Sequence, residues 1–315
     1  MRRILCLFAA LMLFFPSGAA HAQRGDLSAR FASEKSISLN GQTYRLRSRL
    51  TTALLMGIDQ TSESSGGYRN GGHADFQLLI VVDDNRKTVV SFQLDRDTMT
   101  EITVLGVLGH VTGSRTAQLA LAHAFGDGGQ RSCELAVSAV EKLLLGTPVD
   151  EYFAMSMDGI AAFNDALGGI EVTLEDDFSA YDASMLPGVT LRLQGMQAEY
   201  YVRQRYYVGD QTNASRLGRQ SVYLSKAKDV LRERLSQSPN FITTLFNAVE
   251  PYSVTSMSRG FLINLANKLD EYEVLPLASL AGTHRQGESG YMEFYPDEKS
   301  LQEFVIETFY EPAAW

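Results

Sequence analysis

The chain has 315 residues with 28 Lys or Arg against 37 Asp or Glu, so its formal net charge at pH 7 is −9. This acidic balance argues against a general nucleic-acid binder, because such proteins need a basic surface to neutralise phosphates. Cys6 and Cys133 are the only cysteines, which excludes a disulfide framework and a thiolate zinc site. We expect Cys133 to pack as a small apolar side chain.

The first 22 residues are typical of a secretory signal peptide. Arg2 and Arg3 precede an apolar run at residues 4–15, and Ala-His-Ala at residues 20–22 matches a cleavage site. The apolar run is shorter than the roughly 20 residues that a membrane span needs. We therefore predict an exported protein at the extracytoplasmic face of the cell membrane or in the cell wall, with a retained anchor as the alternative.

Two further regions are predicted after the leader. Residues 23–48 are polar and are predicted to be a lead-in with a short strand near residues 37–39. Residues 49–315 are predicted to form a single domain, because no internal repeat or long linker divides them.

The first strands of the domain are predicted from apolar and β-branched runs. These runs are residues 52–58, 76–82 and 88–94. The first is continuously apolar, as expected of a strand buried on both faces, and it ends at Asp59. Residues 60–72 are rich in Ser, Gly and Asn and indicate a loop. Residues 83–86, Asp-Asp-Asn-Arg, indicate a hairpin turn between the second and third runs.

Helices and strands alternate along the rest of the chain. Helices are predicted at residues 117–125, 131–145, 159–167, 195–202, 214–234, 241–249, 258–269 and 298–309. Short strands are predicted at residues 152–157, 170–174, 272–275 and 291–294. This alternation predicts an α/β fold of three layers, α/β/α, in which a central mixed sheet lies between helices.

Arginine is concentrated in one short part of the chain. Four arginines and a glutamine lie within residues 203–220: Arg203, Arg205, Arg216, Arg219 and Gln220. The guanidinium group is permanently charged and binds phosphate through a planar fork of donors. In a helix, Arg216, Arg219 and Gln220 share one face. Because the rest of the chain is acidic, this local cluster suits the binding of a compact anion. The alternative is that the arginines lie on a solvated helix face where acidic side chains balance their charge.

Charged residues also stand where predicted strands begin or end. Asp59 follows the first strand, Asp75 precedes the second, and Arg96 with Asp97 follows the third. Loops at strand ends converge to form sites in open α/β sheets. Because Mg²⁺ takes one or two protein carboxylates and completes its shell with water and phosphate oxygens, Asp59 and Asp75 are candidate metal ligands. The alternative is that they cap helices or form turns.

Five segments in chain order resemble signatures of the LytR-CpsA-Psr family. They are Leu-Leu-Met-Gly-Ile-Asp at 54–59, His-Ala-Asp at 73–75, Gln-Leu-Asp-Arg-Asp-Thr at 93–98, Phe-Asn-Asp-Ala-Leu-Gly-Gly-Ile-Glu-Val at 163–172, and residues 198–205 with Arg-x-x-Arg-Gln at 216–220. The resemblance covers residues 50–310. It implies the fold of that family and a catalytic role for the domain at residues 49–315.

The resemblance also implies an activity and its partners. Members of the family attach glycopolymers, such as teichoic acid or capsular polysaccharide, to peptidoglycan by phosphoryl transfer from a polyprenyl diphosphate carrier. The implied partners are the lipid-linked glycan, peptidoglycan and, through the lipid, the membrane surface, with no nucleic acid. The implied cofactor is Mg²⁺, with Mn²⁺ as a possible substitute.

Site roles follow from the matched motifs. Asp59 and Asp75 are the implied metal ligands. The implied diphosphate-binding residues are Arg96, Arg203, Arg205, Arg216, Arg219 and Gln220. The implied catalytic residues are Asp75, Arg96 and Asp97. Asp75 and Asp97 are both candidates for the base that accepts the proton of an acceptor hydroxyl, and Asp97 is alternatively a structural partner of Arg96.

The sequence departs from the family pattern at several positions and leaves other functions open. His73 stands where the family often has arginine, Gln118 where lysine is common, and Asn213 where aspartate is common. A diphosphatase that releases lipid-linked glycan to water is an alternative, as is a non-catalytic binder of lipid-linked or wall glycan.

Overall fold

The structure is a computed structural model that describes residues 36–39, 41–60, 71–211, 213–238 and 240–313. The predicted signal peptide and residues 61–70 of the predicted loop lie outside the described residues. None of the helices within the described ranges is both long and apolar enough to cross a membrane.

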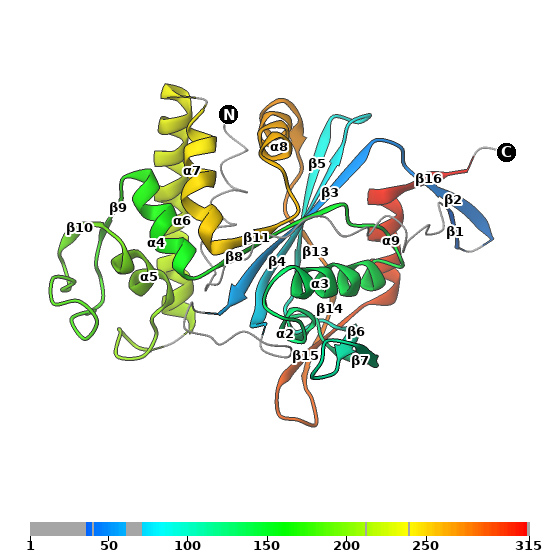
Figure 1. The fold of residues 1–315 in the computed structure, drawn as a ribbon, viewed down its shortest axis with the longest axis horizontal. Helices are drawn as coiled ribbons and strands as arrows, with labels where there is room; N and C mark the ends of the chain where they lie inside the picture. The colour runs from blue at the N-terminus through cyan, green and yellow to red at the C-terminus, as the bar shows by residue number, and fades with distance from the viewer. Residues whose placement is uncertain (1–35, 40, 61–70, 212, 239, 314–315) are drawn as a thin grey trace.

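A mixed β-sheet forms the centre of the described part of the molecule (Figure 1). Its strands are β3 (Leu50–Asp59), β4 (His73–Asp83), β5 (Thr88–Leu94), β8 (Glu151–Ser156), β11 (Ser253–Thr255), β12 (Glu273–Val274) and β13 (Ala278–Ser279). The strand order is β11-β8-β3-β4-β5-β12, and β13 also pairs with β5. β3 runs parallel to β8 and antiparallel to β4, so the predicted mixed sheet is confirmed.

Helices cover both faces of this sheet, which confirms the three-layer prediction (Figure 1). On one face lie α4 (Asp158–Leu167), α5 (Met196–Arg203), α6 (Asn213–Gln237), α7 (Phe241–Val249), the short 3-10 turn η1 (Glu250–Tyr252) and α8 (Arg259–Glu271). On the other lie α2 (Leu121–Ala124), α3 (Gln130–Leu143) and α9 (Glu298–Phe309).

The alternation of side chains along β3 builds two separate cores. Ala53 and Leu55 pack in the core shared with α4 to α8, while Leu54 and Met56 pack in the core shared with α3 and α9. Successive strand residues point to opposite faces, so a continuously apolar strand must be covered on both sides. Cys133 is fully buried in the second core, as predicted.

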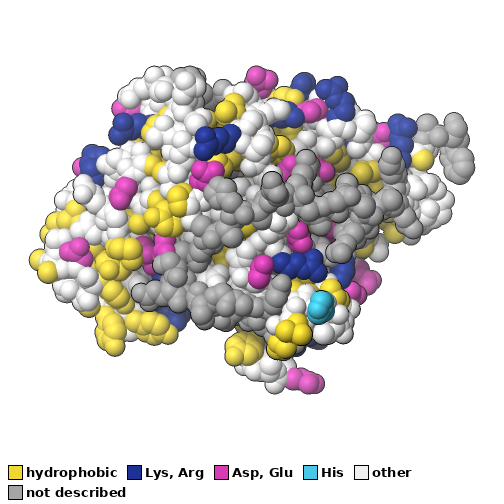
Figure 2. Space-filling view, in the orientation of Figure 1, with side chains coloured by type: hydrophobic (Ala, Val, Ile, Leu, Met, Phe, Trp, Pro, Cys, Tyr) yellow, Lys and Arg dark blue, Asp and Glu magenta, His cyan; other side chains and the backbone are white. Residues whose placement is uncertain are grey.

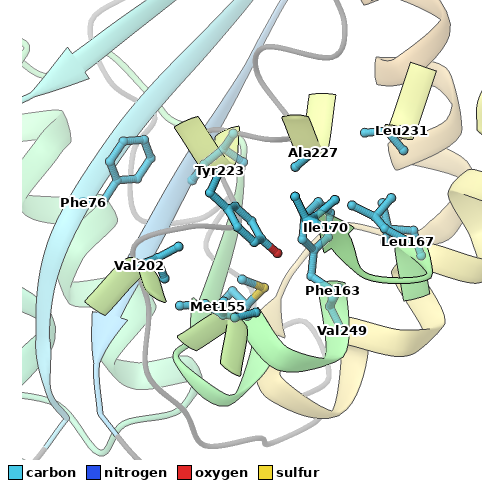
Figure 3. Close-up of a cluster of buried hydrophobic side chains, with 14 of the residues drawn as sticks. Phe76, Met155, Phe163, Leu167, Ile170, Val202, Tyr223, Ala227, Leu231 and Val249 are labelled. Carbon is cyan, nitrogen blue, oxygen red and sulfur yellow. The ribbon is translucent and has the colours of Figure 1, made fainter. Parts of the chain in front are cut away.

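The first core, part of which Figure 3 shows with Tyr223 among its apolar side chains, also contains a set of three hydrogen bonds centred on Asn164. The hydroxyl of Tyr223 on α6 donates to Asn164 Oδ1 on α4 at 3.0 Å. The same Oδ1 accepts from the backbone N–H of Ile170, and Asn164 Nδ2 donates to the carbonyl of Leu193. Because buried polar groups are costly unless paired, this set fixes how α4, α6 and strand β9 (Ile170–Thr173) meet.

Smaller sheets surround the central one. They are β1 (Ser36–Leu39), β2 (Gln42–Leu46) and β16 (Tyr310–Pro312); β6 (Met99–Leu105) and β7 (Val111–Gln118); β9 (Ile170–Thr173) and β10 (Thr190–Leu193); and β14 (Gly282–Gln286) and β15 (Met292–Pro296). β2 pairs with β16 near the end of the chain. The second half of the predicted lead-in is therefore an integral part of the fold.

The predicted helix over residues 117–125 is wrong in its first half. Ala117 and Gln118 pair with Thr100 and Met99 as the end of β7, and α2 covers only Leu121–Ala124. The Leu and Ala residues of this segment have high helix propensity, which produced the prediction. Pairing with β6 overrides that local preference, and residues 111–116 are all exposed, so no apolar alternation announces the strand.

A buried carboxyl group on α3 makes stability depend on pH. Glu141 Oε1 accepts a hydrogen bond from the backbone N–H of Val149 at 3.0 Å. Burial raises the pKa of Glu141 to about 7, and the charge of Asp150 adds to the rise while the Val149 N–H opposes it. The folded state therefore favours the neutral carboxyl more than the unfolded chain does.

We expect the contribution of Glu141 to the free energy of unfolding to fall by about 3 kcal/mol as pH rises from 4.5 to 7. The loss begins where Glu141 ionises in the unfolded chain and is complete once the folded carboxyl has ionised. Urea unfolding of Glu141→Gln against wild type at pH 5 and pH 8 checks this, since the amide keeps the acceptor oxygen and cannot ionise. Glu303→Gln on α9 is the exposed control, and equal pH dependence in all three proteins would contradict the prediction.

Candidate functional site

Two carboxylates meet where β3 ends and β4 begins. Asp59 is the last residue of β3 and pairs in register with His73, the first residue of β4. Asp75 follows two residues later. Burial raises the pKa of Asp75, and the Arg96 cation opposes the rise, whereas the charge of Asp59 adds to it. Antiparallel pairing thus brings the two predicted metal ligands within electrostatic reach of each other.

Arg96 lies against this pair from the end of β5. Its Nη1 is 2.7 Å from Asp75 Oδ1, and its Nε is 3.5 Å from Asp97 Oδ1. Gln118, at the end of β7, donates from Nε2 to the same Asp97 oxygen at 3.0 Å and to the carbonyl of Met292 at 2.6 Å. Gln118, at a position where the sequence departs from the family pattern, therefore holds the Arg96–Asp97 pair in place.

The arginine segment approaches from α5. Arg203 Nη2 is 3.7 Å from Asp59 Oδ1, and its Nη1 is 2.9 Å from Glu199 Oε1. Glu199 is only 3% exposed, and burial raises its pKa while Arg203 opposes the rise. Sequence reasoning missed Glu199, although its spacing of four residues from Arg203 on a predicted helix is the signal of an intrahelical ion pair.

Arg205 and Arg216 extend the positive region. Burial lowers the pKa of Arg216, and the cations Arg205 and Arg203 lower it further, whereas Asp75 opposes the decrease. Arg205 Nη2 donates to the hydroxyl of Tyr206 at 3.0 Å. Cations that destabilise one another's charged forms form a site at which a bound anion is favoured.

Arg219 and Gln220 lie behind this group and hold the backbone of the arginine segment. Arg219 is 8% exposed; its Nε donates to the carbonyl of Tyr201, its Nη1 to Asp176, and its Nη2 to the carbonyl of Gln204. Gln220 Nε2 donates to the carbonyl of Val202 at 2.9 Å. These donors satisfy carbonyls at the C-terminal end of α5 that have no partner within the helix. Their placement favours a positioning role for both residues.

The donor set suits a cation that a substrate helps to bind. Over the described residues, no group of three or more His, Cys, Asp or Glu side chains is arranged to hold a metal ion. Asp59 and Asp75 alone match Mg²⁺, which takes one or two protein carboxylates and leaves other positions to water and phosphate. Burial raises the pKa of Asp75, and the charge of Asp59 raises it further. A cation between the two carboxylates would stabilise their charged forms, so the raised pKa is consistent with a metal site there.

Curated relatives match parts of this chain. Biofilm regulatory protein A of Streptococcus mutans is 31% identical over 164 residues, which are 49% of this chain and 37% of that protein. Polyisoprenyl-teichoic acid–peptidoglycan teichoic acid transferase TagU of Bacillus mycoides is 27% identical over 159 residues, which are 50% of this chain and 45% of that protein. The chain thus spans less than half the length of these two relatives.

A solved structure has the same fold. TagT bound to LI-WTA is similar with a TM-score of 0.55 and 21% sequence identity. The likeness covers 92% of this chain and 98% of that one. A structure of B. subtilis TagT is similar with a TM-score of 0.54 and 22% identity. The profile of the LytR_cpsA_psr family matches residues 18–308, which includes every described residue of the candidate site. The chain therefore belongs to the LytR_cpsA_psr family.

Proposed function

We propose that this protein transfers a glycan phosphate from a polyprenyl diphosphate carrier to a hydroxyl group of peptidoglycan. The observation that carries the proposal is that arginines from three parts of the chain converge on Asp59 and Asp75, at the end of β3 and the start of β4. These arginines follow β5 and lie on α5 and α6. A compact, highly charged anion such as a diphosphate matches this arrangement. The name of the relative TagU describes a transfer of this kind.

The arginines would hold the diphosphate and stabilise its charge. Phosphoryl transfer depends on positioning and on stabilising charge at the phosphoryl oxygens more than on covalent chemistry. Arg203 and Arg96 are already oriented by carboxylates, so few of their rotamers need to be ordered at the moment of binding. Asp59 and Asp75 would hold Mg²⁺ or Mn²⁺, which when bound would neutralise part of the charge on the phosphates.

The contacts of the two candidate bases support different roles for them. Asp75 Oδ1 is engaged by Arg96, and a cation beside Asp75 would lower its proton affinity. Asp97 is anchored through Oδ1 by Gln118 and Arg96, and among the described residues no hydrogen bond or ion pair involves its Oδ2. We assign Asp97 Oδ2 as the acceptor of the hydroxyl proton. As that proton leaves, the acceptor oxygen bonds to the glycan-bearing phosphorus and polyprenyl phosphate departs with the bridging oxygen.

The proposed location follows from the proposed substrates. A polyprenyl carrier lies in the membrane and peptidoglycan lies outside it, so the enzyme would act at the extracytoplasmic face of the membrane. Its contact with the membrane surface would be made through the lipid substrate. The acidic net charge of the chain supports the expectation that nucleic acid is not among its partners.

Acceptor-dependent product formation tests this proposal. Purified protein with Mg²⁺ and a glycan on a polyprenyl diphosphate is expected to release polyprenyl phosphate and to label peptidoglycan when peptidoglycan is supplied. Release at the same rate without acceptor, with the glycan phosphate in solution, would replace the proposal with the diphosphatase. Tight lipid binding without release in either case would replace it with the non-catalytic binder.

A further inference from the structure

Two exposed tyrosines directly follow Arg205 on a loop at residues 204–210. Tyr206 is 61% exposed and Tyr207 is 77% exposed. The guanidinium carbon of Arg205 lies 5.0 Å from the centroid of the Tyr206 ring, and Arg205 also donates to the Tyr206 hydroxyl. The first ring is thus fixed directly beside the candidate diphosphate site.

The loop is anchored on several sides. Arg219 donates to the carbonyl of Gln204, and the hydroxyl of Tyr181 donates to the carbonyl of Tyr206 at 2.9 Å. Val208 is almost fully buried in the core. Gly209 passes so close to Asp176 that a Cβ there would overlap the carboxylate. These contacts make the loop a rigid support for the two rings.

Tyr207 adopts a backbone conformation that a bulky side chain rarely takes. Its φ is 58°, in the left-handed region. Its side chain makes no hydrogen bond or ring contact with any other described residue. The anchored loop therefore holds a large aromatic ring out in solvent at a conformational cost, and residues in such strained backbone conformations cluster at functional sites.

The surroundings of the rings indicate the chemistry of the ligand. Residues 175–182 meet the loop where Tyr181 donates to the Tyr206 carbonyl and where Asp176 lies against Gly209, and they carry four carboxylates and no Lys or Arg. Figure 2 shows hydrophobic side chains gathered at the end of the molecule that carries β10 and α5. An acidic border repels an anionic lipid surface. Asp176, Asp177 and Asp182 already accept from Arg219, Ser179, Ser184 and Gln197, and each carboxylate oxygen has a second lone pair for a ligand hydroxyl. Such acceptors beside a flat apolar ring suit a sugar, which has a C–H face and a hydroxyl rim.

We propose that Tyr207, supported by Tyr206 and the neighbouring carboxylates, forms a carbohydrate subsite next to the diphosphate site. The inference rests on the proposed function, because the adjoining arginines give the subsite its role. The sugar that it binds belongs either to the donor glycan or to the peptidoglycan strand. In both cases the ring would orient a sugar relative to the reacting phosphate.

Calorimetric titration of wild type, Tyr207→Gly and Tyr207→Phe tests the subsite. Glycine suits a left-handed φ, so Tyr207→Gly removes the ring and the backbone strain together, and its melting temperature is expected to stay near that of wild type. The donor probes are farnesyl diphosphate and farnesyl diphosphate bearing N-acetylglucosamine. The acceptor probe is a β-1,4-linked tetramer of N-acetylglucosamine.

Wild type and Tyr207→Phe are expected to bind a sugar-bearing probe about five- to tenfold more tightly than Tyr207→Gly does, the size of one aromatic contact. The probe that responds identifies the sugar as donor or acceptor. Farnesyl diphosphate is expected to bind all three proteins equally. Unchanged binding of both sugar probes by Tyr207→Gly overturns the subsite. Phosphatidylglycerol vesicles are titrated as a further probe, and if Tyr207→Gly weakens binding to these vesicles alone, the subsite is overturned as well. Failure of wild type to bind farnesyl diphosphate instead overturns the proposed function.

Discussion

Arg96→Ala is expected to lower the rate of polyprenyl phosphate release by about 10³-fold, the lower end of the range for removing an arginine that stabilises a transferring phosphoryl group. The substitution removes the cation that is 2.7 Å from Asp75 and 3.5 Å from Asp97. Burial already raises the pKa of Asp75, and without Arg96 nothing in the described contacts of that carboxyl opposes the rise as strongly. The variant therefore loses a proposed phosphate ligand, and its Asp75, a proposed metal ligand, is more often protonated.

Two further variants separate this effect from general damage. Arg45→Ala removes an exposed arginine that pairs with Glu311 on the β2–β16 sheet, and we expect it to retain the wild-type rate. Arg96→Lys keeps the charge without the planar fork, and we expect it to recover part of the lost rate. The measurement is initial rate at saturating acceptor, with thermal unfolding as the check on folding. A folded Arg96→Ala protein with the wild-type rate would remove Arg96 from the site.

The strands that carry the site could be predicted because burial on both faces leaves a plain pattern. Residues 53–58 contain no polar side chain, and their polar neighbour Asp59 marks where the strand leaves the core. The β6–β7 hairpin had no such signal. All residues from 111 to 116 are exposed, so their strand is defined by pairing with β6 and not by side-chain alternation. As a result Gln118 was known only as a departure from a pattern and not as a partner of Asp97.

Helical spacing predicted which residues share a face but not where that face points. Arg216, Arg219 and Gln220 lie on one side of α6, as the spacing requires. Burial lowers the pKa of Arg216, and the charges of Arg205 and Asp75 in the candidate site shift it as well. Arg219 and Gln220 instead donate to carbonyls at the end of α5. The difference arises from the docking of α5 against α6, which depends on contacts distant in sequence. Residue type and spacing alone cannot distinguish a phosphate ligand from a helix cap.

Asp97→Asn is expected to lower the rate of transfer by 10²- to 10⁴-fold, the usual range for loss of a general base. The amide has the shape of the carboxylate, and its oxygen can still accept from Gln118 at the position of Oδ1. What is lost is the oxygen that would take the proton of the acceptor hydroxyl. Binding of the lipid diphosphate is therefore expected to change by less than about threefold, so the effect should appear in kcat and not in the dissociation constant.

Asp75→Asn gives the comparison that assigns the two carboxylates. If Asp75 holds the metal, its amide variant should need a higher concentration of Mn²⁺ for half-maximal rate and should bind Mn²⁺ more weakly when binding is measured directly. Asp97→Asn should leave the Mn²⁺ requirement unchanged, because its Oδ1 is committed to Gln118 and Arg96. The opposite result would assign the role of base to Asp75. In that case Asp97→Asn keeps the wild-type rate, and Asp75→Asn loses rate that added Mn²⁺ does not restore. Asp97 would then serve only as a structural partner of Arg96, through the ion pair between them.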